Sequence, residues 1–169
     1  MKNLAPLALA TALAIPSAWA ATVFNDAAAP NGTHVQSGTP TCQESGFTVT
    51  CSSYDLAGVG HTNATANLSV TYSGTVLCTN PAGNVAPGQT KYPSIPTSSG
   101  TIQPKNGRMT VPVLVSADQA TIEAALMENT SCPNRKWTKS VQAGTIAIVG
   151  YTYTLTFAGY NSAYITISG

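Results

Sequence analysis

The chain has 169 residues and a formal net charge of +1, and only 8% of its residues are charged, against about 25% in an average domain. So few cations form no basic patch, which argues against nucleic acid and anionic lipid as partners. Serine, threonine and asparagine must therefore supply most of the polar surface.

Residues 1–20 form a predicted secretory signal peptide. Lys2 gives a positive start, residues 4–15 are an apolar stretch, and Ala18-Trp19-Ala20 is a small-x-small cleavage site. A membrane anchor is the weaker alternative, because a spanning helix needs about 20 apolar residues and prolines interrupt this run. We expect residues 21–169 to be one exported domain, extracellular, on the cell surface or periplasmic, with no membrane insertion.

The first half of that domain predicts strands of uneven clarity. Residues 22–24 suggest a short strand within a segment that otherwise reads as loop, and 46–51 alternate apolar residues with threonine. A connection is expected at 52–63. Residues 66–79 alternate strictly, which predicts a long strand with one buried face. A strand of that length predicts a bend or bulge near Gly74.

The second half predicts further strands and one helix. In 107–116 one face is expected to carry Met109, Val111, Val113 and Val115, and Pro112 suits only an edge or a position pointing away from the ladder. A short helix is expected over 117–128, capped by Ser116 or Asp118, with Ile122, Leu126 and Met127 near one face. Alternation returns in 136–141, 145–149, 151–157 and 163–168.

Together these elements predict an all-β fold. Seven to nine short strands with one minor helix and Gly, Pro and Asn turns favour an antiparallel β-sandwich, immunoglobulin-like or similar, and a barrel is the alternative.

The four cysteines, an even number in an exported chain, predict two disulfides, for which three pairings are possible. We expect Cys42–Cys51, because the pair flanks a short hairpin turned at Ser45-Gly46. The second bond is then Cys78–Cys132, and because Cys78 lies on the buried face we expect it to cross the core.

Three short motifs give the chain a resemblance. They are Cys-Thr-Asn-x-x-Gly-Asn from Cys78, Lys-Asn-Gly from Lys105, and Cys-Pro-Asn-x-x-Trp from Cys132. As a set they resemble a group of small secreted bacterial proteins of unknown function, over about two-thirds of the exported chain. The resemblance supports the Cys78–Cys132 pairing and implies no activity.

No set of residues has the spacing that catalysis or metal binding needs. His34, His61, Glu44 and Asp55 are scattered, and the chain has no H-x-x-x-H, H-E-x-x-H or G-x-S-x-G motif. The four cysteines are assigned to disulfides, which removes a thiol nucleophile. We therefore predict a non-enzyme with no catalytic, metal or cofactor site.

The remaining hypotheses concern binding. Trp137, Tyr92, Asn80 and Asn84 are the candidate contact residues, for a glycan or another surface protein. The leading interpretation is a secreted, non-catalytic contact protein, and the alternatives are a carbohydrate-binding module and a fibre or pilus-type subunit using the C-terminal strand. Alternating threonines at 152–156 also suggest a flat polar face.

Overall fold

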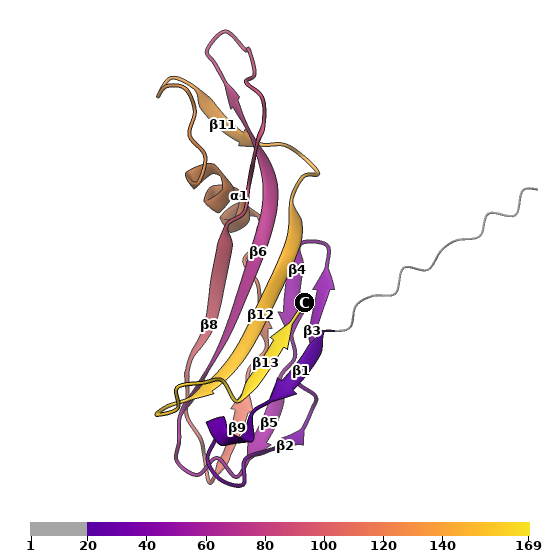
Figure 1. The fold of residues 1–169 in the computed structure, drawn as a ribbon, viewed down its shortest axis with the longest axis vertical. Helices are drawn as coiled ribbons and strands as arrows, with labels where there is room; N and C mark the ends of the chain where they lie inside the picture. The colour runs from indigo at the N-terminus through magenta and orange to yellow at the C-terminus, as the bar shows by residue number, and fades with distance from the viewer. Residues whose placement is uncertain (1–19) are drawn as a thin grey trace, which may run out of the picture.

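The computed structural model describes residues 20–169, so the predicted signal peptide lies, apart from Ala20, outside the described residues. Figure 1 shows an elongated arrangement in which the long strands β6 and β12 lie in front of the shorter strands β4, β5 and β9. The described residues form thirteen strands, one α-helix and one 3-10 helix: β1 Ala21–Phe24, η1 Asp26–Ala28, β2 His34–Ser37, β3 Cys42–Ser45, β4 Thr48–Cys51, β5 Tyr54–Ala57, β6 Ala64–Thr79, β7 Gln89–Lys91, β8 Ser94–Ile102, β9 Arg108–Val111, β10 Leu114–Val115, α1 Gln119–Glu128, β11 Thr138–Val141, β12 Ala147–Phe157 and β13 Ile165–Ser168.

One layer is a seven-stranded antiparallel sheet with β6 as its spine. The first part of β6, up to Ser73, pairs with β12 on one side and β8 on the other. From Gly74 onward β7 takes the side of β8, and β11 takes the side of β12. The sheet continues beyond β12 through β13 to β1 at its edge. The 16-residue strand predicted most clearly by alternation therefore organises the whole layer.

Gly74 marks a change of partner, and the irregularity nearest to it lies on the neighbouring strand. The register of β6 with β12 shifts between Ile148 and Gly150, opposite Tyr72 and Thr71, and its register with β8 shifts between Thr65 and Asn67. Gly74 is needed for packing, because a Cβ added there would come 2.5 Å from Leu126 Cδ1 on helix α1. The absent side chain lets the helix lie directly on β6.

The opposite layer consists of two three-stranded sheets, β3-β4-β10 and β2-β5-β9. β4 is followed at once by β5, and β9 is followed at once by β10. The chain therefore passes twice from one of these sheets to the other, and strand pairing is interrupted at both crossings. Pro112 stands at the interruption, as its missing N–H requires. The Ser53 hydroxyl donates to the Val111 carbonyl (2.7 Å), which satisfies a backbone acceptor where the ladder is broken.

This interruption corrects one prediction. Met109 and Val111 are buried as expected, but Val113 is 50% exposed and Val115 46% exposed, and Leu114 is buried in their place. The break at Pro112 shifts the alternation by one residue, because a strand's side chains change face whenever its register slips by one.

Four strands, β2, β5, β7 and β8, were not expected from the sequence. The expected connection at 52–63 contains β5, whose Tyr54 and Leu56 are buried. β8 consists mostly of serine, threonine and proline beside β6, and none of its residues is fully buried. Such a strand lacks the apolar alternation that identifies a strand in a sequence.

The core lies between the layers, and the inner faces of β6 and β12 supply much of it. Leu68, Val70 and Tyr72 on β6 are fully buried, as is Leu155 on β12. The hydroxyls of Tyr54 and Tyr153, from opposite layers, lie 2.9 Å apart in a buried hydrogen bond. The two tyrosines thus satisfy each other's polar atom within the core.

Breaking this pair has a definite expected cost. In Tyr54→Phe the Tyr153 hydroxyl stays buried without its partner, so the free energy of unfolding should fall by about 1–3 kcal/mol. Tyr153→Phe should behave alike, and the double variant should cost less than the sum of the single ones. Chemical denaturation measures the cycle, with Tyr92→Phe as the control because Tyr92 is 65% exposed. Additive single losses would show that the two hydroxyls do not interact.

The same two tyrosines predict that the protein loses stability at alkaline pH. Burial raises the pKa of Tyr54, with Tyr153 as a further cause, and burial also raises the pKa of Tyr153. A folded-state pKa above the unfolded value means that stability is full below about pH 10 and is lost as pH rises further. The double Tyr→Phe variant should lose less of its stability between about pH 9 and about pH 11 than the wild type, measured by denaturation at each pH. Equal losses would contradict this.

Helix α1 and both disulfides agree with the sequence. Asp118 caps the helix by accepting a hydrogen bond from the Thr121 N–H (2.8 Å), and Ile122 and Leu126 are buried. Cys42–Cys51 closes the β3–β4 hairpin, and Cys78–Cys132 forms as predicted. The expectation that the second bond crosses the core is wrong, because Cys132 lies in the segment between α1 and β11, and β11 pairs with β6, the strand that carries Cys78. It fastens that segment to β6.

Candidate functional site

Two connecting loops meet at the end of the molecule that carries α1 and β11 (Figure 1). They are 80–88, which follows β6, and 129–137, which precedes β11. Pairing of Thr138 with Thr79 places the loops next to each other, and the Cys78–Cys132 disulfide joins their bases. We call this region the Trp137 end.

Three of the four predicted contact residues lie at the Trp137 end: Trp137, Asn80 and Asn84. The fourth, Tyr92, follows Lys91, which pairs with Gly74 on the other side of β6. Thr79 is five residue positions beyond Gly74 on β6, so Tyr92 and Trp137 are roughly 20 Å apart along the strand. The structure therefore does not bring these two aromatic side chains together.

Loop 80–88 is held by Asn80. Its side-chain oxygen accepts hydrogen bonds from the backbone N–H groups of Ala82 (3.0 Å) and Asn84 (2.8 Å). The Ala86 N–H donates to the Cys78 carbonyl (2.9 Å), which returns the loop to its base. The carboxamide oxygen of Asn80 thus shapes the turn, while Asn84 stands exposed on it.

Segment 129–137 is fastened to the last turn of α1. The Asn129 side chain donates to the Ala125 carbonyl (2.8 Å), the Thr130 hydroxyl to the Leu126 carbonyl (2.9 Å), and Lys139 Nζ to the Met127 carbonyl (2.7 Å). These are the carbonyls that a helix leaves without intrahelical partners. Gln89 Nε2 also donates to the Ser131 carbonyl (2.9 Å), so β7 holds the segment from the other side.

A shallow groove of about 420 Å³ opens beside this segment. It is lined by Thr130, Ser131, Cys132, Asn134, Arg135, Trp137 and Lys139. The lining combines one indole, two cations and one carboxamide, and none of its residues is acidic. The Trp137 side chain is half-buried, and the Trp137 backbone N–H donates to the Asn134 carbonyl (3.2 Å), which fixes the approach to β11.

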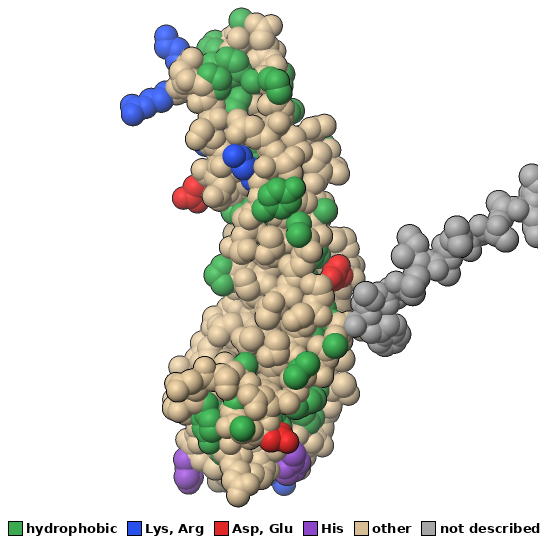
Figure 2. All heavy atoms as spheres, viewed as in Figure 1, with side chains coloured by type: hydrophobic (Ala, Val, Ile, Leu, Met, Phe, Trp, Pro, Cys, Tyr) green, Lys and Arg blue, Asp and Glu red, His purple; other side chains and the backbone are tan. Residues whose placement is uncertain are grey.

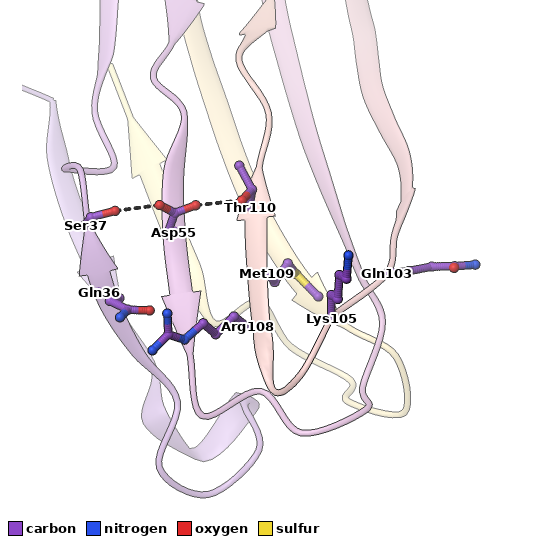
Figure 3. Close-up of a pocket in the computed structure, with 8 residues that line it drawn as sticks. All are labelled: Gln36, Ser37, Asp55, Gln103, Lys105, Arg108, Met109 and Thr110. Carbon is purple, nitrogen blue, oxygen red and sulfur yellow. Dashed lines mark hydrogen bonds between the residues drawn. The ribbon is translucent and has the colours of Figure 1, made fainter.

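A second groove, of about 620 Å³, lies at the opposite end, on strands β2, β5 and β9 (Figure 3). Asp55 stands on the middle strand. The Ser37 hydroxyl donates to Asp55 Oδ2 (2.6 Å) and the Thr110 hydroxyl to Oδ1 (2.7 Å), which are the dashed lines in Figure 3. One carboxylate thus ties the three strands together.

These bonds set the proton affinity of Asp55. The Ser37 hydroxyl, then the Thr110 hydroxyl and the Arg108 charge, hold the pKa of Asp55 below its ordinary value. A carboxyl group held in this way stays ionised and does not exchange protons near neutral pH, so it is poorly suited to general acid–base catalysis.

The lowered pKa of Asp55 predicts how the stability of the protein changes at acidic pH. Its folded-state pKa is lowered, so its contribution to stability is present above about pH 4 and is lost as pH falls through the folded value. Between about pH 6 and about pH 2, the wild type should lose more of its unfolding free energy than Asp55→Asn, measured by denaturation at each pH. Parallel curves for the two proteins would show that the carboxylate contributes nothing as an ion.

The outer face of the seven-stranded sheet is uncharged. By strand register its paired positions hold hydroxyl, amide, small apolar or proline side chains: Val23, Thr65, Asn67, Ser69, Thr71, Pro96, Ser98, Thr152, Thr154, Thr156, Thr166 and Ser168 among them. In Figure 2 the middle of this face is almost wholly tan, and acidic and basic side chains lie toward its margins and ends. The predicted threonine row thus belongs to a broad polar face, which offers no aromatic platform at its paired positions.

Three further tyrosines are largely structural. Tyr151 and Tyr164 are buried, and Tyr160 is half-buried with its ring 6.4 Å from that of Phe157. The C-terminal strand β13 pairs with β1 on one side and β12 on the other. It completes the protein's own sheet and has no free edge for another subunit.

The scattered histidines and acids are not assembled. Within residues 20–169, no three side chains of the His, Cys, Asp and Glu types come together as a metal site. Among the same residues, no helix has the length and apolar character needed to cross a membrane.

No protein-family model, curated protein or solved structure matches this chain. The resemblance drawn from the three motifs and the immunoglobulin-like subclass of the sandwich therefore stay predictions. Two of the motifs nevertheless have a clear structural role, since Cys78-Thr79-Asn80 and Cys132 to Trp137 build the Trp137 end.

Proposed function

We propose that this protein is secreted and acts outside the cell by binding, without catalysis. Two disulfides within residues 20–169 fit an oxidising environment, and the signal-peptide pattern of residues 1–20 fits export. The observation that carries the proposal is the Trp137 end, where backbone and side-chain bonds hold an indole, two cations and an amide around one groove.

The absence of catalysis is tested directly. We expect purified protein to turn over no substrate in a panel of glycosides, esters and peptides. The result that would contradict this proposal is an activity that disappears in Asp55→Asn or His61→Ala while the variant remains folded. Such a result would replace a contact protein with an enzyme.

Carbohydrate binding is the more specific form of the proposal. An indole ring presents a large apolar surface with a polar edge, which suits one face of a sugar ring, and Asn134 lies in the same groove. Retention on immobilised polysaccharides should be lost in Trp137→Ala and kept in Tyr92→Ala, because Tyr92 lies elsewhere on the sheet. Equal loss in both variants, or none in either, would contradict a site at the Trp137 end.

A further inference from the structure

We propose that the groove at the Trp137 end recognises a saccharide that carries an anionic group, a carboxylate or a sulfate. This inference rests on the proposed binding function and names its ligand class. It arises from the juxtaposition of Trp137 with Arg135 and Lys139 in one groove that no acidic side chain lines.

The charge of the groove is one-sided although the chain as a whole is nearly neutral. The groove lies against the C-terminal turn of α1, and such an end carries partial negative charge from unpaired carbonyls. Here the carbonyls of Ala125, Leu126 and Met127 are each occupied by a donor. The backbone of the helix end therefore presents less negative charge to an anion than an uncapped end would, although Glu128, the last residue of α1, is acidic.

The two cations, Lys139 and Arg135, play different roles in the proposed site. Lys139 has one of its three N–H donors engaged by the Met127 carbonyl, which anchors the ammonium group and leaves its other donors available. Arg135 is exposed, and a guanidinium can donate two parallel hydrogen bonds to a carboxylate, sulfate or phosphate. The anchored ammonium of Lys139 and the nearby planar guanidinium of Arg135 are together suited to bind an anionic substituent of a sugar ring.

Bonds within the protein also hold parts of the groove lining in place. The Asn134 side chain accepts from the Lys136 N–H (2.9 Å), and the Cys78–Cys132 disulfide fixes the wall to β6. A preformed site loses less conformational freedom on binding.

The test compares ligands that differ in charge alone. Binding of the full chain is measured by calorimetry with galacturonate oligosaccharides and with their methyl esters, and then with sulfated and unsulfated dextran. We expect at least one acid form to bind about tenfold or more tightly than its neutral counterpart, as expected for a charged hydrogen bond. Which acid form binds identifies the anionic group.

Neighbouring substitutions provide the matched control. Arg135→Gln and Lys136→Gln remove the same charge one residue apart, but only Arg135 lines the groove. Arg135→Gln should weaken binding of the acid form about tenfold, and Lys136→Gln should change it less than about twofold. Equal weakening by both substitutions would show that the acid form is not recognised in the groove and is held only by general attraction between the protein and polyanions.

The remaining outcomes separate the two proposals. If neutral and acidic forms bind equally and Trp137→Ala abolishes both, saccharide binding stands and acid recognition is wrong. If no probe, acidic or neutral, binds, the ligand class named here is wrong, and the contact function is then decided by the polysaccharide retention test.

Discussion

Replacing both cysteines of the Cys78–Cys132 bond with alanine is expected to lower the free energy of unfolding by about 4 kcal/mol. The bond spans 54 residues, and a cross-link over a loop of that length removes considerable conformational freedom from the unfolded chain. Because it also fastens the base of loop 80–88 to segment 129–137, we expect the Trp137 groove to become mobile in the folded protein. Denaturation at equilibrium measures the stability, and hydrogen exchange of 129–137 measures the local effect.

The matched control is the double alanine variant of Cys42 and Cys51. That bond spans 9 residues, so the same reasoning gives a smaller loss of about 2.5 kcal/mol. Exchange at the Trp137 end should be unchanged in this variant, because Cys42 and Cys51 belong to the β3–β4 hairpin. A larger loss from the short loop than from the long one would contradict the expected order.

Gly58→Ala is expected to destabilise the fold by about 3 kcal/mol, which combines the strain of a left-handed conformation with overpacking. Gly58 has a positive φ of +76°, and a Cβ at this position would collide with the Gly32 carbonyl oxygen. Backbone atoms cannot rotate away as a flexible side chain does, so the connection before β6 would have to move away from the one before β2.

Gly60→Ala separates these two causes. Gly60 has a φ of +58°, and a Cβ added to it would have no other atom within 4 Å. Only the conformational cost of about 1 kcal/mol should therefore appear. Thermal or chemical denaturation of both variants provides the comparison. Equal losses would show that the contact between Gly58 and Gly32 is unimportant.

The sequence predicted the parts of the fold that depend on burial. Strict alternation identified β6 and the 151–157 part of β12, because one face of each lies in the core. The apolar pair Ile122 and Leu126 located the helix for the same reason, and Asp118 marked its start as an N-cap. The segments 145–149 and 151–157 were predicted as separate strands, and the structure joins most of them in β12. The exposed strand β8 and the register change at Pro112 escaped prediction, because pairing and strand breaks are set by partners distant in sequence.

The sequence identified several residues of the candidate site, but it did not predict that they lie together in space. The hairpin between Cys42 and Cys51 left Cys78 and Cys132 as the second pair, and residue type marked Trp137 and Asn80 as contact candidates. The structure places these residues at one end. The contributions of Arg135 and Lys139 were missed, since the cluster 134–139 reads in isolation as a solvated turn. Only the packing of segment 129–137 on the end of α1 shows that these cations share a groove with the indole.

The fluorescence of Trp137 tests the central claim most directly. The chain has two tryptophans, Trp19 and Trp137, so a Trp19→Phe variant of the full chain reports on the groove alone. Titration with the bound acidic saccharide should shift the emission of Trp137 in a saturable way, and Arg135→Gln should move the midpoint about tenfold to higher concentration. Binding shown by calorimetry without any change in Trp137 emission would place the ligand elsewhere and contradict the account.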